Sequence, residues 1–494
     1  MASRRQALQK RSAVAKRPHI LLIVTDQQRG DCLGLDGHPV LSTPNMDELG
    51  ASGAFFRHGY SEVPSCIPAR RILISGQNQV STGMVGMQGS EEFKPPHTVA
   101  GELTKAGYQT HLVGKLHQFP FRKRYGFESM VKSDGPLGEF NPEKEPDDYH
   151  TFLGRHGYLP SDAMAHGLDP NGWVGRPWHL SERLHFTNWC VDESIDFLKR
   201  RDPTVPFFLK LSIFAPHPPL IPPQLYYDRY MQMDLPPAAI GDWVDAEHTP
   251  GTGVEGARVS ASRVRIAPDA LIRCRAAYYG LVNHIDDQLG CLFTAMRRMG
   301  LLNDTFILFT SDHGEMLGDH HMYRKTFAYE ASARVPFLAR APQWMGCHAG
   351  QRLNQVVGLQ DVAPTLLDAA GAAIPSSMDG RSVLPLMRGE QPAWREFLHG
   401  EHSGCYRNED GMHYLTDGKE KYIWYSQTGQ EQLFDLLDDP CECVDLARQA
   451  QNAQRVAPWR KRLVAQLKDR PEGFSDGKKL IAGRPHEYLI PAGK

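Results

Sequence analysis

The feature that most constrains the fold is a set of short apolar segments, each followed by a polar residue. Four such segments, rich in β-branched and aromatic residues, are predicted to be strands: 18–25, 109–114, 206–214 and 305–311. Continuous apolar runs of this length are typical of a parallel sheet that is buried on both faces. The polar residues that follow them include Asp26, Lys115, His217 and Asp312. Because ligands bind beyond the carboxyl ends of such strands, these side chains are predicted to share one site.

Helix signals lie between the predicted strands. Caps, a closing glycine or amphipathic spacing indicate helices at 43–53, 98–106, 267–299 and 361–370, and the third is long enough to be broken once. Strands that alternate with helices predict an α/β fold. Residues 236–267 are rich in glycine, proline and charge, and we expect a surface excursion there.

The pattern changes after Pro385. Short strands are predicted at 395–399, 412–416, 419–425 and 430–436, separated by turn residues, and a helix at 456–468 follows them. We therefore expect three regions. They are a flexible basic arm at 1–17, a large α/β domain at 18–385, and a smaller α+β domain at 386–494 built on a short antiparallel sheet.

Charge and composition exclude several classes of protein. The chain has 55 Lys and Arg against 57 Asp and Glu, and this balance argues against nucleic acid as a partner. There is no apolar run of about 18 residues, so no membrane span is expected. The basic N-terminus lacks the apolar core of a secretory signal, and the nine cysteines are scattered. Both features favour a reducing, cytoplasmic location.

The most informative stretch is Cys66-Ile67-Pro68-Ala69-Arg70, which is predicted to begin a helix. Peptide N–H groups and the helix dipole would then face whatever Cys66 carries, which favours an anion at that position. Arg70, one turn later, could hold the same anion or orient the group derived from Cys66. Taken alone, the stretch is more typical of a capped helix with a buried cysteine.

The spacing Cys-x-Pro-Ala-Arg with a following Ser-Gly resembles the signature of the sulfatase family, in the alkaline-phosphatase-like superfamily. Other segments occur in that family's order and spacing, and together they extend the resemblance from His19 to about Leu446. They are Asp26-Gln27, Gly114-Lys115-Leu116-His117, Ala215-Pro216-His217-Pro218, and Ser311-Asp312-His313-Gly314-Glu315 with Lys325. The resemblance implies a large mixed, mostly parallel sheet sandwiched by helices, with 18–385 as the catalytic domain.

The resemblance also implies a divalent metal, usually Ca²⁺, and a formylglycine made from Cys66 by a maturation enzyme. The expected ligands are Asp26, Gln27, Asp312, His313 and the oxygen at position 66. Carboxylate and amide oxygens suit Ca²⁺ or Mg²⁺, and an imidazole would also suit Mn²⁺. Gln27 and His313 stand where the commonest family pattern has Asp and Asn.

The implied reaction is hydrolysis of a sulfate monoester to an alcohol and inorganic sulfate. One hydroxyl of the hydrated aldehyde attacks sulfur to give a covalent sulfo-formylglycine intermediate, and the other hydroxyl expels sulfate. Lys115 and Lys325 are expected to bind the sulfuryl oxygens. His217 is expected to protonate the leaving oxygen and His117 to act on the formylglycine hydroxyl, although these two roles could be exchanged.

Two other functions stay open. Phosphonate monoester or phosphodiester hydrolases share this scaffold, but they tend to have neutral hydroxyl residues where this chain has Lys115 and His117. A catalytically silent binding protein of the same fold is the non-enzyme alternative, although every matched position is filled. The sequence does not distinguish an aryl, sugar or alkyl sulfate as substrate, nor does it reveal the self-association that is common in the family. His402 is expected near the domain junction, where it could line the substrate pocket, and His320 and His321 are expected to be structural.

Overall fold

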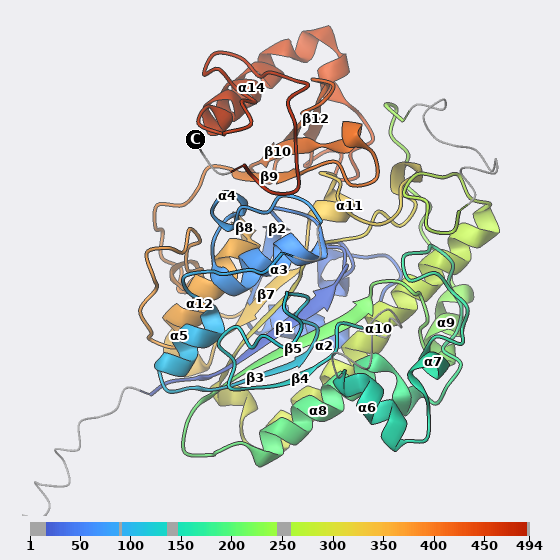
Figure 1. Cartoon of the computed structure of the whole chain (residues 1–494), viewed down its shortest axis with the longest axis vertical. Coiled ribbons are helices and arrows are strands. Elements are labelled where there is room, and N and C mark those ends of the chain that lie inside the picture. The colour runs from blue at the N-terminus through green and yellow to red at the C-terminus, as the bar shows by residue number, and fades with distance from the viewer. Residues whose placement is uncertain (1–15, 88–90, 136–146, 245–257, 492–494) are drawn as a thin grey trace, which may run out of the picture.

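The computed structural model describes residues 16–87, 91–135, 147–244 and 258–491 (Figure 1). The predicted basic arm and the middle of the predicted excursion at 236–267 lie almost wholly outside these ranges. The main sheet has eight strands: β1 (His19–Asp26), β2 (Ala54–Tyr60), β3 (Gln109–Gly114), β4 (Ser129–Lys132), β5 (Phe207–Pro216), β6 (Thr305–Ser311), β7 (Phe337–Arg340) and β8 (Gln351–Gly358). Their order is β4-β3-β5-β1-β6-β7-β2-β8.

The sheet is mostly parallel, as predicted. Only β7 runs antiparallel to its neighbours, β6 and β2. The four predicted strands correspond to β3, β5, β1 and β6, which lie side by side in the interior of the sheet. The sequence did not reveal β2, β4, β7 and β8. Strands β4 and β7 have only four residues each, and the first half of β8 is partly exposed.

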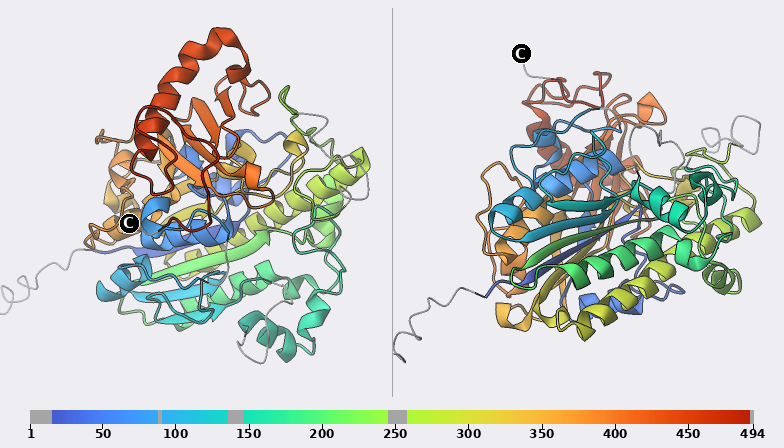
Figure 2. Two further views of the ribbon diagram at one scale, coloured as in Figure 1. Left: turned by 45° about the horizontal axis from the view of Figure 1, so that its top comes forward. Right: turned by 60° about the horizontal axis from the view of Figure 1, so that its bottom comes forward.

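Helices cover both faces of the sheet (Figure 2). In β1, Ile20 and Leu22 face one hydrophobic core, while Leu21 and Ile23 face the other. The first core includes residues of α3 (Cys66–Ser75), α5 (Val99–Lys105) and α12 (Val362–Ala369). The second includes residues of α2 (Pro44–Ala51), α8 (Phe186–Arg200) and α10 (Pro268–Arg298). Helix α10 continues for 31 residues without the break that the sequence allowed.

A second sheet of four antiparallel strands follows, which confirms the predicted α+β arrangement. Its strands are β9 (Leu398–His402), β10 (Met412–Thr416), β11 (Glu420–Tyr425) and β12 (Glu431–Asp435), in the order β12-β11-β10-β9, and helix α14 (Ala453–Leu467) packs on it. Strand β9 begins three residues later than expected and contains Gly400. A Cβ there would lie 2.2 Å from the ring of Tyr414, so this strand requires glycine. The boundary at 385 stays a prediction.

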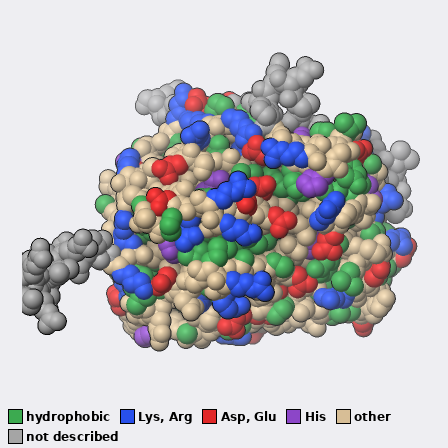
Figure 3. Space-filling view, turned by 90° about the horizontal axis from the view of Figure 1, so that it is seen from below, with side chains coloured by type: hydrophobic (Ala, Val, Ile, Leu, Met, Phe, Trp, Pro, Cys, Tyr) green, Lys and Arg blue, Asp and Glu red, His purple; other side chains and the backbone are tan. Residues whose placement is uncertain are grey.

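Acidic and basic side chains are interspersed on the face of the molecule in Figure 3, in keeping with the near-zero net charge. Within the described ranges, no helix combines the length and apolar composition needed to cross a bilayer.

Candidate active site

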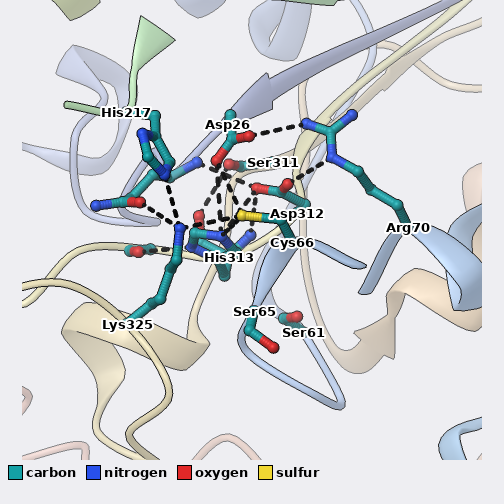
Figure 4. A network of polar contacts seen from close by, with 12 residues as sticks. Asp26, Ser61, Ser65, Cys66, Arg70, His217, Ser311, Asp312, His313 and Lys325 are labelled. Atoms are coloured by element: carbon teal, nitrogen blue, oxygen red, sulfur yellow. Dashed lines mark hydrogen bonds and ion pairs between the residues drawn. The ribbon is translucent and has the colours of Figure 1, made fainter. Parts of the chain in front are cut away.

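The side chains expected to share a site lie together at the carboxyl edge of the main sheet. Figure 4 labels seven of them: Asp26, Cys66, Arg70, His217, Asp312, His313 and Lys325. Strands β1, β3, β5 and β6 end there, and α3 begins beside them. Nine of the ten candidate residues are buried, and His117 is partly exposed. The buried nine are Asp26, Gln27, Cys66, Arg70, Lys115, His217, Asp312, His313 and Lys325.

Cys66 is the first residue of α3 and lies at the centre of the site. Its Sγ lies 3.0 Å from Nζ of Lys325, 3.2 Å from Nε2 of His313 and 3.7 Å from Oδ1 of Asp26. Burial alone would raise the pKa of the thiol. However, the charges of Lys325, Lys115 and His313 lower this pKa well below its ordinary value. The site therefore stabilises a negative charge at position 66.

Arg70 is fully buried, and its hydrogen bonds go to the protein. Its Nε donates to Oδ2 of Asp312 at 2.7 Å, and one terminal nitrogen lies 3.4 Å from Oδ2 of Asp26. The other terminal nitrogen donates to the carbonyl of Lys115 at 3.0 Å and to the hydroxyl of Ser212 at 2.9 Å. Of the two roles that the sequence left open, these contacts support orientation of the site over direct binding of a substrate anion.

Four potential metal ligands converge beside Arg70. One ligating atom from each of Asp26, Cys66, Asp312 and His313 lies within 4.8 Å of the others. Nε2 of His313 is 3.6 Å from Oδ1 of both aspartates, and Nδ1 donates to the carbonyl of Gly314. Two carboxylates and an imidazole nitrogen, once Nε2 of His313 has lost its proton, form a donor set that fits a divalent cation.

Gln27, the fifth predicted ligand, is engaged elsewhere. Its Oε1 accepts from Nζ of Lys325 at 3.0 Å, and its Nε2 donates to Glu315. Its backbone lies in the left-handed region, with φ of 72°. Such conformations persist for non-glycine residues only where the surroundings hold them, and they are common at functional sites.

His217 and Lys325 form a hydrogen-bonded pair. Nε2 of His217 lies 2.8 Å from Nζ of Lys325, and its Nδ1 lies 2.7 Å from the carbonyl of Pro218. Nδ1 therefore donates to the carbonyl and Nε2 accepts from the ammonium. Burial and the charge of Lys325 lower the pKa of His217 to about 4, so the imidazole is neutral at neutral pH.

Lys115 and His117 approach position 66 from the turn after β3. The ammonium of Lys115 pairs with Asp26 and lies 4.8 Å from the ring centre of Phe214. The side chain of His117 is close enough to Cys66 to help lower the pKa of its thiol, and its Nδ1 is buried without a hydrogen-bond partner among the described residues. Both residues therefore lie where the sequence placed them, at the end of a central strand.

Other side chains support the site from outside it, and of these Ser212 carried no signal in the sequence. Ser212 holds Arg70, and His402 from β9 accepts a hydrogen bond from the Ser65 hydroxyl at 2.8 Å. His402 is fully buried, so it supports the start of α3 instead of lining a cavity. His320 is also buried, 4.6 Å from the ring of Trp243, as expected for a structural histidine.

A second group of potential metal ligands, His399, Glu401 and His413, is buried in the four-stranded sheet. Nε2 of Gln79 donates both to the carbonyl and to Nδ1 of His399, so the proton of this ring is on Nε2. That nitrogen lies 3.2 Å from Nδ1 of His413, to which it donates. Arg470 binds both oxygens of Glu401 at 2.6 and 2.9 Å. The group is therefore explained as a polar network without a metal.

The fold and the site together define a class of protein. Helices on both faces of a mostly parallel sheet, with a cysteine among carboxylates and lysines at its carboxyl edge, are typical of the alkaline-phosphatase-like hydrolases. The family model described as Sulfatase matches residues 18–372, and one described as N-sulphoglucosamine sulphohydrolase, C-terminal, matches 318–469. The chain belongs to the sulfatase family and is a sulfuric ester hydrolase.

Individual relatives agree with this assignment. The arylsulfatase of Clostridium perfringens (strain 13 / Type A) is 42% identical over 482 residues, which cover 96% of this chain and 99% of that protein. The phosphonate monoester hydrolase of Agrobacterium radiobacter has a TM-score of 0.76 at 24% identity, covering 95% of this chain and 100% of that chain. A protein solved with its substrate D-glucosamine-2-N,6-O-disulfate has a TM-score of 0.72 at 22% identity, covering 92% and 98%. These two structures share the fold of this chain.

Proposed function

We propose that this chain hydrolyses a small aryl, sugar or alkyl sulfate monoester after Cys66 has been converted to formylglycine. The observation that carries the proposal is the position of Cys66 at the start of α3, with Lys325 and His313 within 3.2 Å of its Sγ. When hydrated, formylglycine supplies one hydroxyl to attack sulfur and another to release sulfate. A cysteine thiol could attack sulfur once but has no second group to drive the release of sulfate.

Asp26, Asp312 and His313 would hold the divalent metal, with Ca²⁺ as the expected ion. Gln27 would join them if its amide turned away from Lys325. The cation would supply positive charge that favours an anionic oxygen at position 66. Arg70 holds one oxygen of each aspartate, which leaves Oδ1 of both facing His313.

The remaining side chains would bind the sulfate and move protons. Lys115, which pairs with Asp26, and Lys325, whose Nζ lies 3.0 Å from Sγ of Cys66, would bind the sulfuryl oxygens. Nε2 of His217 carries no proton of its own in the resting site. The proton that it shares with Lys325 would therefore be the one transferred to the leaving oxygen. His117, which is close enough to position 66 to lower the pKa of the thiol, is assigned to proton transfer during sulfate release.

The test is a comparison of ester types with matured protein. Sulfate release from aryl, sugar and choline-type sulfates is measured beside hydrolysis of a phosphonate monoester, and mass analysis of the peptide containing residue 66 reports its conversion. We expect sulfate release to be the faster reaction. Faster phosphonate hydrolysis would favour the second enzyme class, whereas no turnover by converted protein would favour the silent binding protein. Cys66→Ala should abolish turnover, while the control Cys291→Ala, at an exposed cysteine, should not.

A further inference from the structure

Lys115 and His117 depend on a turn with an unusual backbone. Strand β3 ends at Gly114, whose φ is 90°, and a Cβ there would lie 2.1 Å from the carbonyl oxygen of Ser212. His117 also has a left-handed backbone, with φ of 52°. For a residue other than glycine this conformation costs roughly 1–2 kcal/mol, so neighbouring contacts must hold it.

Asp134, just beyond β4, makes those contacts. Its Oδ1 accepts hydrogen bonds from the backbone N–H groups of Leu116 and His117, both at 2.9 Å. Its Oδ2 accepts from Nζ of Lys132 at 2.9 Å. Both Asp134 and Lys132 are buried, so water does not compete strongly for these bonds.

The carboxylate remains charged in this position. Burial would raise the pKa of Asp134, but the charge of Lys132 and the hydrogen bonds to the turn lower it below its ordinary range. Hydrogen bonds from N–H groups to a buried carboxylate are roughly twice as strong as bonds between neutral groups. One side chain thus fixes two consecutive amides of the turn.

We propose that Asp134 is a positioning residue that fixes the turn from which Lys115 and His117 reach position 66. None of the hydrogen bonds of Asp134 goes to Cys66. Asp134 therefore acts through Lys115 and His117. The inference rests on the proposed function, because the roles of Lys115 and His117 in catalysis are part of that function.

The test compares Asp134→Asn and Asp134→Ala with Asp148→Asn in matured protein. Asparagine keeps an oxygen that can accept from both amides, and alanine keeps none. Asp148 is the matched control because it accepts from the backbone N–H of Lys132 and pairs with Arg122 but does not bind the turn. All three variants therefore disturb the same edge of the sheet.

We expect kcat for an aryl sulfate to fall about 10-fold for Asp134→Asn and about 100-fold for Asp134→Ala, since a shift of roughly 1 Å in a catalytic group has effects of this size. KM should change less than about threefold, and Asp148→Asn should retain the wild-type kcat. Hydrogen–deuterium exchange of the amides at 116 and 117 should be faster in both Asp134 variants than in the wild type. In Asp148→Asn it should equal that of the wild type.

Three results would overturn the proposal. They are unchanged exchange at the turn in Asp134→Ala, faster exchange there without loss of kcat, and an equal loss of kcat in Asp148→Asn. Failure of the proposed function has a different signature, because matured wild-type protein would then release no sulfate. The exchange measurement needs no turnover and would still show whether Asp134 holds the turn.

Discussion

Buried charges of both signs meet at position 66. Arg70, Lys115 and Lys325 face Asp26, Asp312 and the Cys66 thiolate. The proposed conversion of the thiolate to an uncharged aldehyde would remove one negative charge and leave the positive charge of the lysines under-compensated. A sulfate monoester carries one negative charge and would restore the balance. The matured site is therefore expected to bind a small anion more tightly than the cysteine form does.

Arg70→Lys should be strongly destabilising and inactivating. A lysine has one ammonium group and cannot contact both aspartates, the Lys115 carbonyl and Ser212 together. Breaking a buried ion pair costs about 3–5 kcal/mol, and we expect a loss of this size in urea unfolding. The control is Arg200→Lys, at an exposed arginine that pairs with Asp196, where the change should stay below about 1 kcal/mol. An equal loss in both variants would contradict this account of Arg70.

The central residues of the site could be predicted from the sequence because each follows a strand or begins a helix. Asp26, Lys115, His217 and Asp312 follow four strands whose apolar character marks their ends. No sequence pattern of this kind points to Asp134, Ser212 or His402. Each acts through a contact with a distant segment, such as the 337 positions between Ser65 and His402. Only the folded chain brings those partners together.

Strand β9 supports the first turn of α3. The Ser65 side chain makes no capping bond to the helix, because its hydroxyl donates to Nε2 of His402. Nδ1 of His402 is hydrogen-bonded to the carbonyl of Ser403, which leaves Nε2 as the acceptor. The small antiparallel sheet is thereby connected to the residue that precedes Cys66.

A double-mutant cycle of Ser65→Ala and His402→Ala tests this link. Each single variant removes one partner of a buried hydrogen bond, which is expected to cost about 1–3 kcal/mol. The double variant should lose less than the sum of the two, with a coupling energy of at least about 0.5 kcal/mol in urea unfolding. Strict additivity would show that the two side chains do not support each other.

The strands that the sequence predicted least well are partly exposed or contain a residue that is unusual in strands. The interior strands β1, β3, β5 and β6 are apolar on both faces and were predicted within two residues at most ends. Strand β8 lies at the edge of the sheet, and its first half has alternating exposure. In β9, Gly400 resembles a strand breaker, but the ring of Tyr414 occupies the space beside it. Tertiary packing thus overrides the local preference.

A buried carboxyl group couples the stability of the whole chain to pH. Burial raises the pKa of Glu62 to about 7 from its ordinary 4.5, although backbone hydrogen bonds oppose the shift. Between these two values, the folded chain keeps a proton that the unfolded chain has lost. The free energy of unfolding should therefore fall as the pH rises through this window, by about 3 kcal/mol from this group.

Glu62→Gln isolates that contribution. We expect the difference in stability between pH 5 and pH 8 to be smaller in the variant than in the wild type, as measured by urea unfolding at both values. Other groups titrate in both proteins and cancel in the comparison. Identical pH dependence in the two proteins would mean that Glu62 ionises normally in the folded state.

Calcium is expected to stabilise the folded chain as well as support turnover. A ligand that binds only the folded state at about 100 times its Kd contributes about 2.7 kcal/mol. The thermal midpoint should therefore rise on addition of Ca²⁺ and fall again with a chelator. Asp312→Asn should abolish this response, whereas the surface variant Asp196→Asn should keep it. A calcium response that survives Asp312→Asn would place the ion elsewhere.

The pairing of β1 has a consequence for the timing of the proposed conversion of Cys66. Residues 19–26 find their neighbours only after 207–216 and 305–311 have been synthesised, and Cys66 is 1% exposed once they have docked. An oxidising partner that must touch this side chain would therefore have to act before the sheet has closed, as it could on the nascent polypeptide while the later strands are still inside or leaving the ribosome. Slower translation between codons 66 and 305 would lengthen that interval and raise the fraction of converted molecules.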